Sequence, residues 1–237
     1  MFHFLASHDG IGLNGAAGWL SAAQTETLVE RARSCGAVSS RSDGAGGVRA
    51  YELNVNLLDM LAGEPLQAPL PDAALARFLC AHAILLALAG VPAIYFHSLM
   101  GSRGDAAAVR MTGRPRSINR EKLVRSVLER ELRQSGSQRR RILDGMTWLL
   151  QARRSHAALH PRGPQVVLRH LPDGVFGVER TALDSDQRLI CLHETSGGGI
   201  VVAPGRGRGR DILTGESLRL DDVGLGPYQA RWIEVVP

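Results

Sequence analysis

A long apolar helix pattern that runs directly into an apolar strand pattern is the feature that most constrains this fold. Residues 71–90, "PDAALARFLCAHAILLALAG", are followed at once by the β-rich run "VPAIYF". The chain also opens with an apolar run, Phe2–Ala6, which predicts a buried strand. Strand, helix, strand and helix in this order, with apolar strands, predict a parallel sheet covered by helices.

The segment between these two strands begins with a helix signal. Ser21 with Gln24 forms a capping-box pattern, which predicts a helix from there to about Cys35, ended by Gly36. Five further elements are expected from the local pattern: a loop or short hairpin over 37–55 with Asp43-Gly44 as its turn, a short helix over 56–62, a polar loop over 97–120, and helices over 121–133 and 137–155.

The pattern changes at residues 160–164, "HPRGP". Beyond this point, short alternating runs are separated by Asp-Gly, Gly-Gly and Gly-Pro turns, which predict an antiparallel β-domain. We therefore expect two domains, residues 1–160 and residues 161–237, and an α/β fold class.

The chain is basic, with a formal net charge of +5 among 237 residues. The arginine runs at 139–141 and in "GRGRGR", residues 205–210, are compatible with a nucleic-acid partner. The second run lacks interleaved aromatic residues and lies between predicted strands, and the first lies on a helix whose other face is apolar. We interpret both as solvated surface and expect no nucleic acid, with a basic nucleic-acid-binding or dinucleotide-binding protein kept as the alternative.

The cysteines Cys35, Cys80 and Cys191 are far apart and have no metal-ligand spacing. Isolated thiols of this kind are typical of a reducing compartment, so we expect a cytoplasmic protein and no metal. No signal-peptide pattern precedes the first strand, and the apolar stretch 73–89 is short for a bilayer and contains Arg77 and His82. We expect no membrane partner.

The first strand is followed by Ser7-His8-Asp9 and then by "GIGLNG", residues 10–15. The glycines fit the dinucleotide-binding pattern, but that pattern needs a helix to begin directly on the turn. Here three polar residues intervene and the helix signal comes only near Ser21. Asp9 can instead be a strand-end residue that caps a loop amide, or a catalytic carboxylate, because the carboxyl ends of strands carry the chemistry in parallel α/β barrels.

Four blocks in order resemble one enzyme family. "FLASHDGIGL" looks like the last signature region of glycoside hydrolase family 13, the α-amylase superfamily, and three further blocks are similar to the closing part of its sucrose phosphorylase group, which includes glucosylglycerate phosphorylases: "RAYELNVNLLDML", "AILLALAGVPAIYFHSLMGS" and "TGRPRSINREKL". The resemblance implies the C-terminal part of a (β/α)8 barrel over residues 1–160, with its last two β/α units, followed by a small antiparallel β-domain.

The resemblance also implies roles for individual residues. Asp9 is the carboxylate that stabilises the oxocarbenium-like transition state, and His8 is its sugar-binding neighbour. Tyr51 and Glu52 border the acceptor and phosphate site, and Glu52 departs from the Tyr-Gln of sucrose phosphorylases, which favours a glucosylglycerate-type acceptor. Arg120 holds the glucosyl unit or attracts phosphate; without the resemblance it is a solvated cap residue. His97 and Asp105 are weaker candidates.

The family's nucleophile and general acid lie on earlier barrel strands, so the resemblance implies a C-terminal fragment that is inactive alone. We expect a retaining transfer of glucosyl from a small glucoside to inorganic phosphate as co-substrate, with no further cofactor. The expected partners are these small molecules and the N-terminal part of the barrel.

Overall fold

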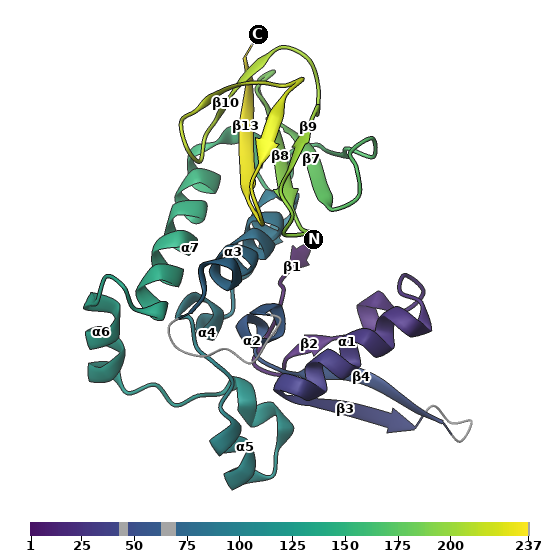
Figure 1. Ribbon diagram of the computed structural model, residues 1–237, viewed down its shortest axis with the longest axis vertical. Coiled ribbons are helices and arrows are strands. Elements are labelled where there is room, and N and C mark those ends of the chain that lie inside the picture. Colours follow the sequence, from purple (N-terminus) through teal and green to yellow (C-terminus); the bar gives the residue numbers. More distant parts are fainter. Residues whose placement is uncertain (43–46, 63–69, 237) are drawn as a thin grey trace. The chain divides into compact units, whose positions relative to one another are not determined.

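The computed structural model describes residues 1–42, 47–62 and 70–236 (Figure 1). Its contacts group the chain into two units, each described below by itself. The sheet unit comprises Met1–His3, Asp72–Ala93 and Asp144–Pro237, and the hairpin unit comprises Phe4–Pro71 and Ile94–Leu143. The predicted boundary between residues 160 and 161 stays a prediction.

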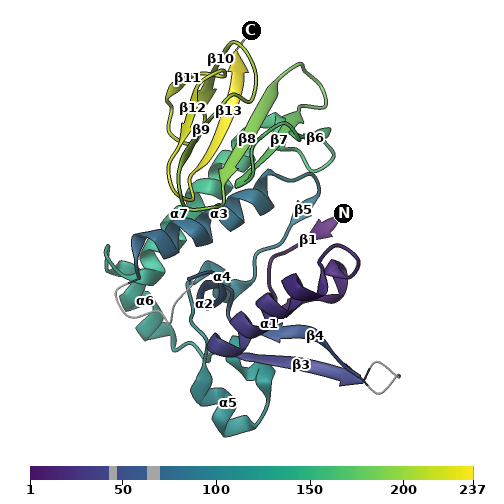
Figure 2. The same cartoon turned by 45° about the vertical axis from the view of Figure 1, so that its right-hand side comes forward.

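The sheet unit is built on an antiparallel sheet of six strands in the order β11-β10-β13-β8-β7-β6 (Figure 2). Its strands are β6 (Gln165–Val167), β7 (Val175–Thr181), β8 (Arg188–Glu194), β10 (Arg208–Asp211), β11 (Ser217–Arg219) and β13 (Ala230–Val236), and the short strands β9 (Ile200–Val202) and β12 (Val223–Leu225) pair with each other. The apolar core of the sheet is formed by Ile190, Leu192, Val202, Leu220, Val223, Leu225 and Ile233. The antiparallel β-region predicted from the alternating runs is thus confirmed.

Helix α3 (Asp72–Ala87) and the part of helix α7 (Gln138–Ser155) from residue 144 onward belong to this unit. Helix α3 contacts β7 and β8, as its largely buried apolar sequence requires. Helix α7, followed by the 3-10 turn η3 (Ala157–Leu159), approaches α3 so closely at Gly145 that a Cβ there would lie 2.6 Å from a methyl carbon of Leu79. Of the predicted apolar stripe of α7, Ile142, Met146 and Leu149 are buried, whereas Leu150 is 37% exposed.

The predicted parallel sheet consists, among the described residues, of two short strands. Strand β1 (Phe2–His3) pairs with β5 (Val91–Pro92). Both were predicted to be buried, but Phe2 is 66% exposed and Val91 is 51% exposed. This prediction is wrong for the chain as it stands, because a two-stranded parallel ribbon without further paired strands among the described residues leaves its faces open.

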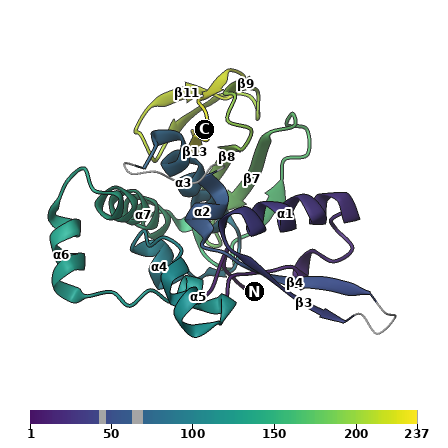
Figure 3. The same ribbon diagram turned by 60° about the horizontal axis from the view of Figure 1, so that its bottom comes forward.

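The hairpin unit begins with β2 (Ile11–Gly12) and the 3-10 turn η1 (Asn14–Ala16), then helix α1 (Ala22–Cys35) and the antiparallel strands β3 (Ala37–Ser42) and β4 (Val48–Asn54). The sheet order is β2-β4-β3, and α1 packs on it around Leu13, Val29, Ala32, Leu53 and Val55 (Figure 3). The capping box of Ser21 and Gln24 and the C-cap Gly36 are confirmed. The hairpin is confirmed as well, and its predicted turn Asp43-Gly44 lies outside the described residues.

The rest of the hairpin unit is helical. It contains α2 (Leu57–Ala62), α4 (Phe96–Leu99), α5 (Ala106–Thr112), the 3-10 helix η2 (Pro115–Asn119) and α6 (Arg125–Arg133). The predicted polar loop over 97–120 is therefore wrong in part, since Asp105 caps α5 through the amide of Ala108 and Gly113 ends it in the left-handed region at φ 66°. These caps form a short helix that periodicity alone does not reveal.

Candidate active site

Asp9 is held by a tight turn that follows the first strand. Ser7 and Gly10 exchange backbone hydrogen bonds of 3.0 and 3.2 Å, and the Asp9 amide donates to the Ser7 hydroxyl at 3.2 Å. Gly10 has φ 132°, and a Cβ there would lie 2.1 Å from the carbonyl oxygen of Leu53. Only glycine lets this turn approach β4, so the first glycine of "GIGLNG" positions Asp9 rather than a nucleotide.

Three cationic or ionisable groups surround the Asp9 carboxylate. Arg120 Nη2 donates to Oδ1 at 2.8 Å, Arg116 Nη1 lies 3.4 Å from Oδ2, and His8 Nε2 lies 3.4 Å from Oδ1. Arg120 Nε also donates to the His8 carbonyl at 3.3 Å. The structure therefore brings together the predicted residues His8, Asp9 and Arg120, and Asp9 keeps a side-chain exposure of 27% through which a ligand can reach it.

Glu52 on β4 joins the same network. Both of its carboxylate oxygens accept from Arg116, at 3.0 Å from Nε and 2.9 Å from Nη2. The side-chain amide of Asn54 donates to Glu52 at 2.5 Å and to the Asp9 carbonyl at 3.0 Å. Since Asn54 is fully buried and Glu52 is only 8% exposed, this part of the network is a rigid support for the turn that carries Asp9.

Tyr51, the residue before Glu52, has a different surrounding. The Arg41 guanidinium lies 5.7 Å from the centre of its ring, and its backbone carbonyl accepts from the amide of Leu13 at 2.9 Å. Its predicted role at the acceptor site stays a prediction.

Arg116 is the functional candidate that the sequence reasoning missed. It lies in η2, where Pro115 at the start of the 3-10 helix presets the backbone. Hydrogen bonding to Glu52 raises the pKa of Arg116 above its usual value, with smaller contributions from the Glu52 and Asp9 charges. The available signal was the repeated arginine in "TGRPRSINR", four residues before Arg120 in the same block.

His97 and Asp105 have structural partners. His97 Nδ1 lies 2.9 Å from the hydroxyl of Ser102, and burial lowers the pKa of His97. Asp105 accepts from the amide of Ala108 as the N-cap of α5. Neither side chain has a contact with Asp9 among the described residues.

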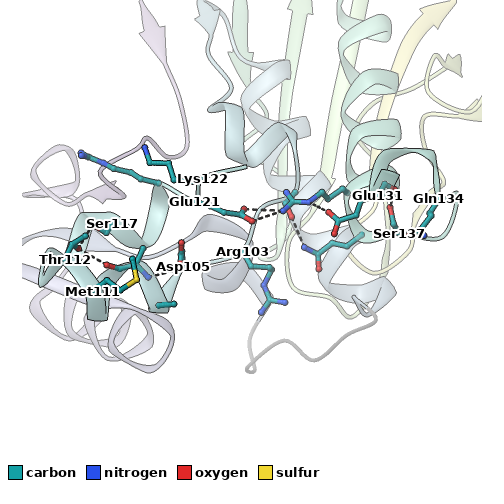
Figure 4. A pocket seen from close by; sticks show the side chains of 17 residues that line it. Arg103, Asp105, Met111, Thr112, Ser117, Glu121, Lys122, Glu131, Gln134 and Ser137 are labelled. Atoms are coloured by element: carbon teal, nitrogen blue, oxygen red, sulfur yellow. Dashed lines mark hydrogen bonds and ion pairs between the residues drawn. The ribbon is translucent and has the colours of Figure 1, made fainter. Parts of the chain in front are cut away.

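Two hollows flank Arg120 in the hairpin unit. One has a volume of about 410 Å³ and is lined by Ser39, Thr112, Gly113, Arg114, Pro115, Arg116, Ser117 and Arg120. The other, of about 1020 Å³, lies between the region of α5 and that of α6 and the start of α7 (Figure 4). The larger one has cations and carboxylates in its wall, whereas only cations occur among the charged residues that line the smaller one.

Arg139 crosses the wall of the larger hollow. Its guanidinium donates to Glu131 at 2.6 Å and to Glu121 at 3.1 Å (Figure 4). It also donates to the Met100 carbonyl and the Ser102 hydroxyl at 3.0 Å each. The prediction that Arg139 lies on the solvated surface of its helix is wrong. Its side chain is only 14% exposed, and four acceptors from different segments surround its guanidinium.

The structure gives no support to a dinucleotide-binding turn at residues 10–15 or to a nucleic-acid-binding run at residues 205–210. The glycines lie in and around β2 and η1, and α1 begins only at Ala22, so they do not lie at a helix N-terminus that could meet a pyrophosphate. Arg208 and Arg210 lie on β10, exposed and alternating with buried Gly209 and Asp211, which is the ordinary pattern of a half-buried strand.

Across the described residues, no group of three or more histidine, cysteine or acidic side chains could hold a metal ion. All three cysteines are free thiols, and burial raises the pKa of Cys35, of Cys80 to about 12, and of Cys191. None of them is therefore a ready thiolate. Among the described helices, none combines the length and the hydropathy that a membrane crossing needs.

Solved structures share the fold of this chain. A sucrose 6F-phosphate phosphorylase from Thermoanaerobacter thermosaccharolyticum matches 82% of the chain and 36% of its own, with TM-score 0.64 at 19% identity. An α-amylase from Anoxybacillus matches 100% of the chain and 38% of its own, with TM-score 0.60 at 16% identity. The fold is thus that of part of an α-amylase-type enzyme, which confirms the predicted fold class.

Curated relatives narrow the resemblance. Glucosylglycerate phosphorylases from Allomeiothermus silvanus and Escherichia coli are 37% and 35% identical over 98% of the chain. The chain spans 40% and 41% of their lengths. No family model matches the chain. These matches confirm the resemblance to the glucosylglycerate and sucrose phosphorylase group of glycoside hydrolase family 13.

Proposed function

We propose that this chain is the part of a retaining glucoside phosphorylase that binds the glucosyl unit and stabilises the transition state of its transfer. The donor is a glucosylglycerate-like glucoside and the acceptor is inorganic phosphate. The observation that carries the proposal is the Asp9 carboxylate, partly exposed and paired with Arg120 at 2.8 Å, in a chain similar over 98% of its length to glucosylglycerate phosphorylases. In this function, His8 and Arg120 bind the glucosyl unit beside Asp9.

Asp9 acts by charge and by hydrogen bonds to the sugar. A carboxylate next to the anomeric centre stabilises the positive charge that develops there, and its hydrogen bonds to hydroxyls tighten as the ring flattens. Arg120 and Arg116 hold the carboxylate by charge-assisted hydrogen bonds, so little reorganisation is needed during the reaction. Phosphate then attacks a glucosyl-enzyme whose nucleophile and general acid are contributed by residues outside this sequence. No cofactor other than this co-substrate is required.

Glu52 contributes to the proposed function by positioning Arg116. Because its carboxylate is bonded to Arg116 and Asn54, Glu52 positions the guanidinium that faces Asp9. The departure from the Tyr-Gln pair of sucrose phosphorylases thus changes the charge of this support, which favours an acceptor other than fructose. We also place the protein in the cytoplasm, since its three cysteines are unpaired thiols.

The first experiment is binding of glucosylglycerate to the full chain by isothermal titration calorimetry. Asp9→Asn should weaken binding at least about tenfold, since a charged hydrogen-bond acceptor is lost at the ligand. The matched control Asp173→Asn removes an exposed carboxylate of the sheet unit and should leave binding unchanged. Binding that is insensitive to Asp9→Asn would count against the proposal.

The second experiment is activity. The chain alone, given glucosylglycerate and phosphate, should release no glucose 1-phosphate, because Asp9 cannot form the covalent intermediate from its supporting position. Co-expression with the N-terminal part of a glucosylglycerate phosphorylase should restore release, and Asp9→Asn should abolish it. Turnover by the chain alone that Asp9→Asn removes would contradict the division of roles.

A further inference from the structure

The smaller hollow of the hairpin unit has the composition of an anion site. Its charged lining consists of Arg114, Arg116 and Arg120, its polar lining includes the hydroxyls of Ser39, Thr112 and Ser117, and its volume is about 410 Å³. Among the described residues that line it, none is acidic. Guanidinium groups and hydroxyls are the donors that proteins use for phosphate and carboxylate ligands.

The three arginines differ in how their charges are used. Arg120 is paired with Asp9 at 2.8 Å and Arg116 with Glu52 at 2.9 Å. Within the described part of the chain, Arg114 has no carboxylate within ion-pair distance. Two of the three positive charges are therefore compensated inside the protein and one is left for a ligand.

The backbone of Arg114 is fixed on both sides. Its amide donates to the hydroxyl of Thr112 at 3.2 Å. The preceding residue, Gly113, ends α5 in the left-handed conformation at φ 66° and donates its amide to the Val109 carbonyl at 2.9 Å, and the next residue, Pro115, begins η2. The direction of the chain at Arg114 is thus determined by two caps, so the side chain of Arg114 leaves the backbone at a fixed position beside the hollow.

We propose that this hollow is the anion subsite of the active site and that Arg114 receives there the phosphate or carboxylate group of the acceptor. The inference rests on the proposed function and refines it, because Arg120 is committed to Asp9 and is not the receptor of the anion. Phosphate that enters for the transfer and the carboxylate of a glycerate unit share this chemistry, namely a small oxyanion bound by a guanidinium fork. The larger hollow suits an anion less, since Glu121, Glu131 and Asp105 line it.

The test is titration of the full chain at low ionic strength with inorganic phosphate, with D-glycerate, and with neutral glycerol. Arg114→Ala should weaken oxyanion binding at least about tenfold, the loss expected for a charge-assisted pair. The control Arg110→Ala removes an exposed arginine of α5 that does not line the hollow and should change binding by less than about twofold. Thermal unfolding of both variants should match that of the parent chain, because both side chains are exposed.

The three ligands distinguish the two possible occupants of the hollow, namely phosphate and the carboxylate of glycerate. Binding of phosphate alone identifies the co-substrate as the occupant, binding of glycerate alone identifies the acceptor carboxylate, and either result with the Arg114 dependence supports the subsite. Glycerol should not bind. Absence of oxyanion binding, or equal weakening by Arg110→Ala, overturns it.

Asp9→Asn distinguishes failure of this inference from failure of the proposed function. Removing the Asp9 charge frees Arg120, so oxyanion binding should be retained or tightened while glucosylglycerate binding is lost. If glucosylglycerate binding depends on Asp9 but no oxyanion binds through Arg114, the subsite alone is wrong. If Arg114 binds phosphate but Asp9→Asn does not affect the glucoside, the subsite stands and the proposed function fails.

Discussion

Two buried carboxylates of the sheet unit and Asp9 of the hairpin unit differ in the groups that satisfy them. In the sheet unit, Glu194 is fully buried and accepts from the amides of Ser196, Gly197 and Tyr228 at 2.7, 2.9 and 2.7 Å. Asp211 is also fully buried and accepts from the amides of Leu213 and Trp232 at 3.1 Å each. In the hairpin unit, the Asp9 carboxylate is partly exposed and faces side chains, namely the guanidinium groups of Arg120 and Arg116 and the ring of His8.

The difference shows what each carboxylate can do. Backbone amides are fixed and consume the acceptor capacity of Glu194, so that group ties a turn to the sheet. Burial acts to raise the pKa of Glu194, yet hydrogen bonds from Ser196, Tyr228 and Gly197 outweigh burial and lower that pKa overall. Arginine side chains that line an open hollow can share their donors with a ligand, so Asp9 remains available for chemistry. A carboxylate alone does not indicate a site; its partners do.

The pH dependence of stability should separate the two units most strongly. Burial lowers the pKa of His82 and of His193 from 6.5 to about 4, and both lie in the sheet unit. As the pH falls below 6.5, these histidines become protonated in the unfolded chain but stay neutral in the folded protein. The free energy of unfolding is therefore highest above pH 6.5 and decreases toward pH 4. The free energy of unfolding should fall by roughly 2 kcal/mol per pH unit near pH 5 to 6.

Amide hydrogen exchange measures this effect in each unit. Protection of β8 should fall more steeply with pH than protection of β4. The variant His82→Gln should reduce the slope, while His170→Gln, which changes an exposed ring, should leave it unchanged. Equal pH slopes in β8 and β4 would show that the buried histidines do not make the sheet unit more sensitive to pH than the hairpin unit.

Removal of Glu194 should be the largest single-residue effect on stability. Glu194→Ala leaves three partly buried backbone amides without their acceptor, which costs about 3 kcal/mol in total. Urea unfolding followed by circular dichroism measures the loss. Glu179→Ala, which breaks the partly exposed pair with Arg188 in the same sheet, should cost less than about 1 kcal/mol. A comparable loss in both variants would show that the backbone contacts of Glu194 are not decisive.

Asn54→Ala should affect both stability and the site. Asn54 is fully buried and connects the Asp9 carbonyl with the Glu52 carboxylate, so its loss should destabilise the hairpin unit by about 2 kcal/mol and weaken glucosylglycerate binding. Exchange of β4 amides and calorimetry report the two effects. Asn14→Ala, at an exposed position, should change neither. Unaltered glucoside binding by Asn54→Ala would show that the Asp9 turn does not need this support.

Asp9→Asn should have the smallest effect on stability and a large one on binding. Exposed and partly exposed ion pairs contribute little, so unfolding should change by less than about 1 kcal/mol. The loss of glucoside binding is measured in the same protein preparation. A stability loss as large as that of Glu194→Ala would place Asp9 with the structural carboxylates.

Local patterns predicted the elements of this chain well where the signal is contained in a few residues. The capping box at Ser21, the hairpin around β3 and β4 and the alternating strands beyond residue 164 follow from short-range chemistry. The burial of Phe2 and Val91 was predicted wrongly, because burial depends on strands that pair with β1 and β5 and not on the apolar sequence alone. The helix α5 was missed because its caps, rather than its periodicity, form it.

The sequence by itself determined helix α1 with its capping box, the β3–β4 hairpin and the resemblance to the phosphorylase group, because each depends on contiguous residues. Only the tertiary structure decided which charges meet. Arg120 and Asp9 are 111 residues apart and Arg116 and Glu52 are 64 apart, so no local pattern pairs them. The fold selects these partners because it brings η2 against β4 and the Asp9 turn, and that choice leaves Arg114 as the cation open to a ligand.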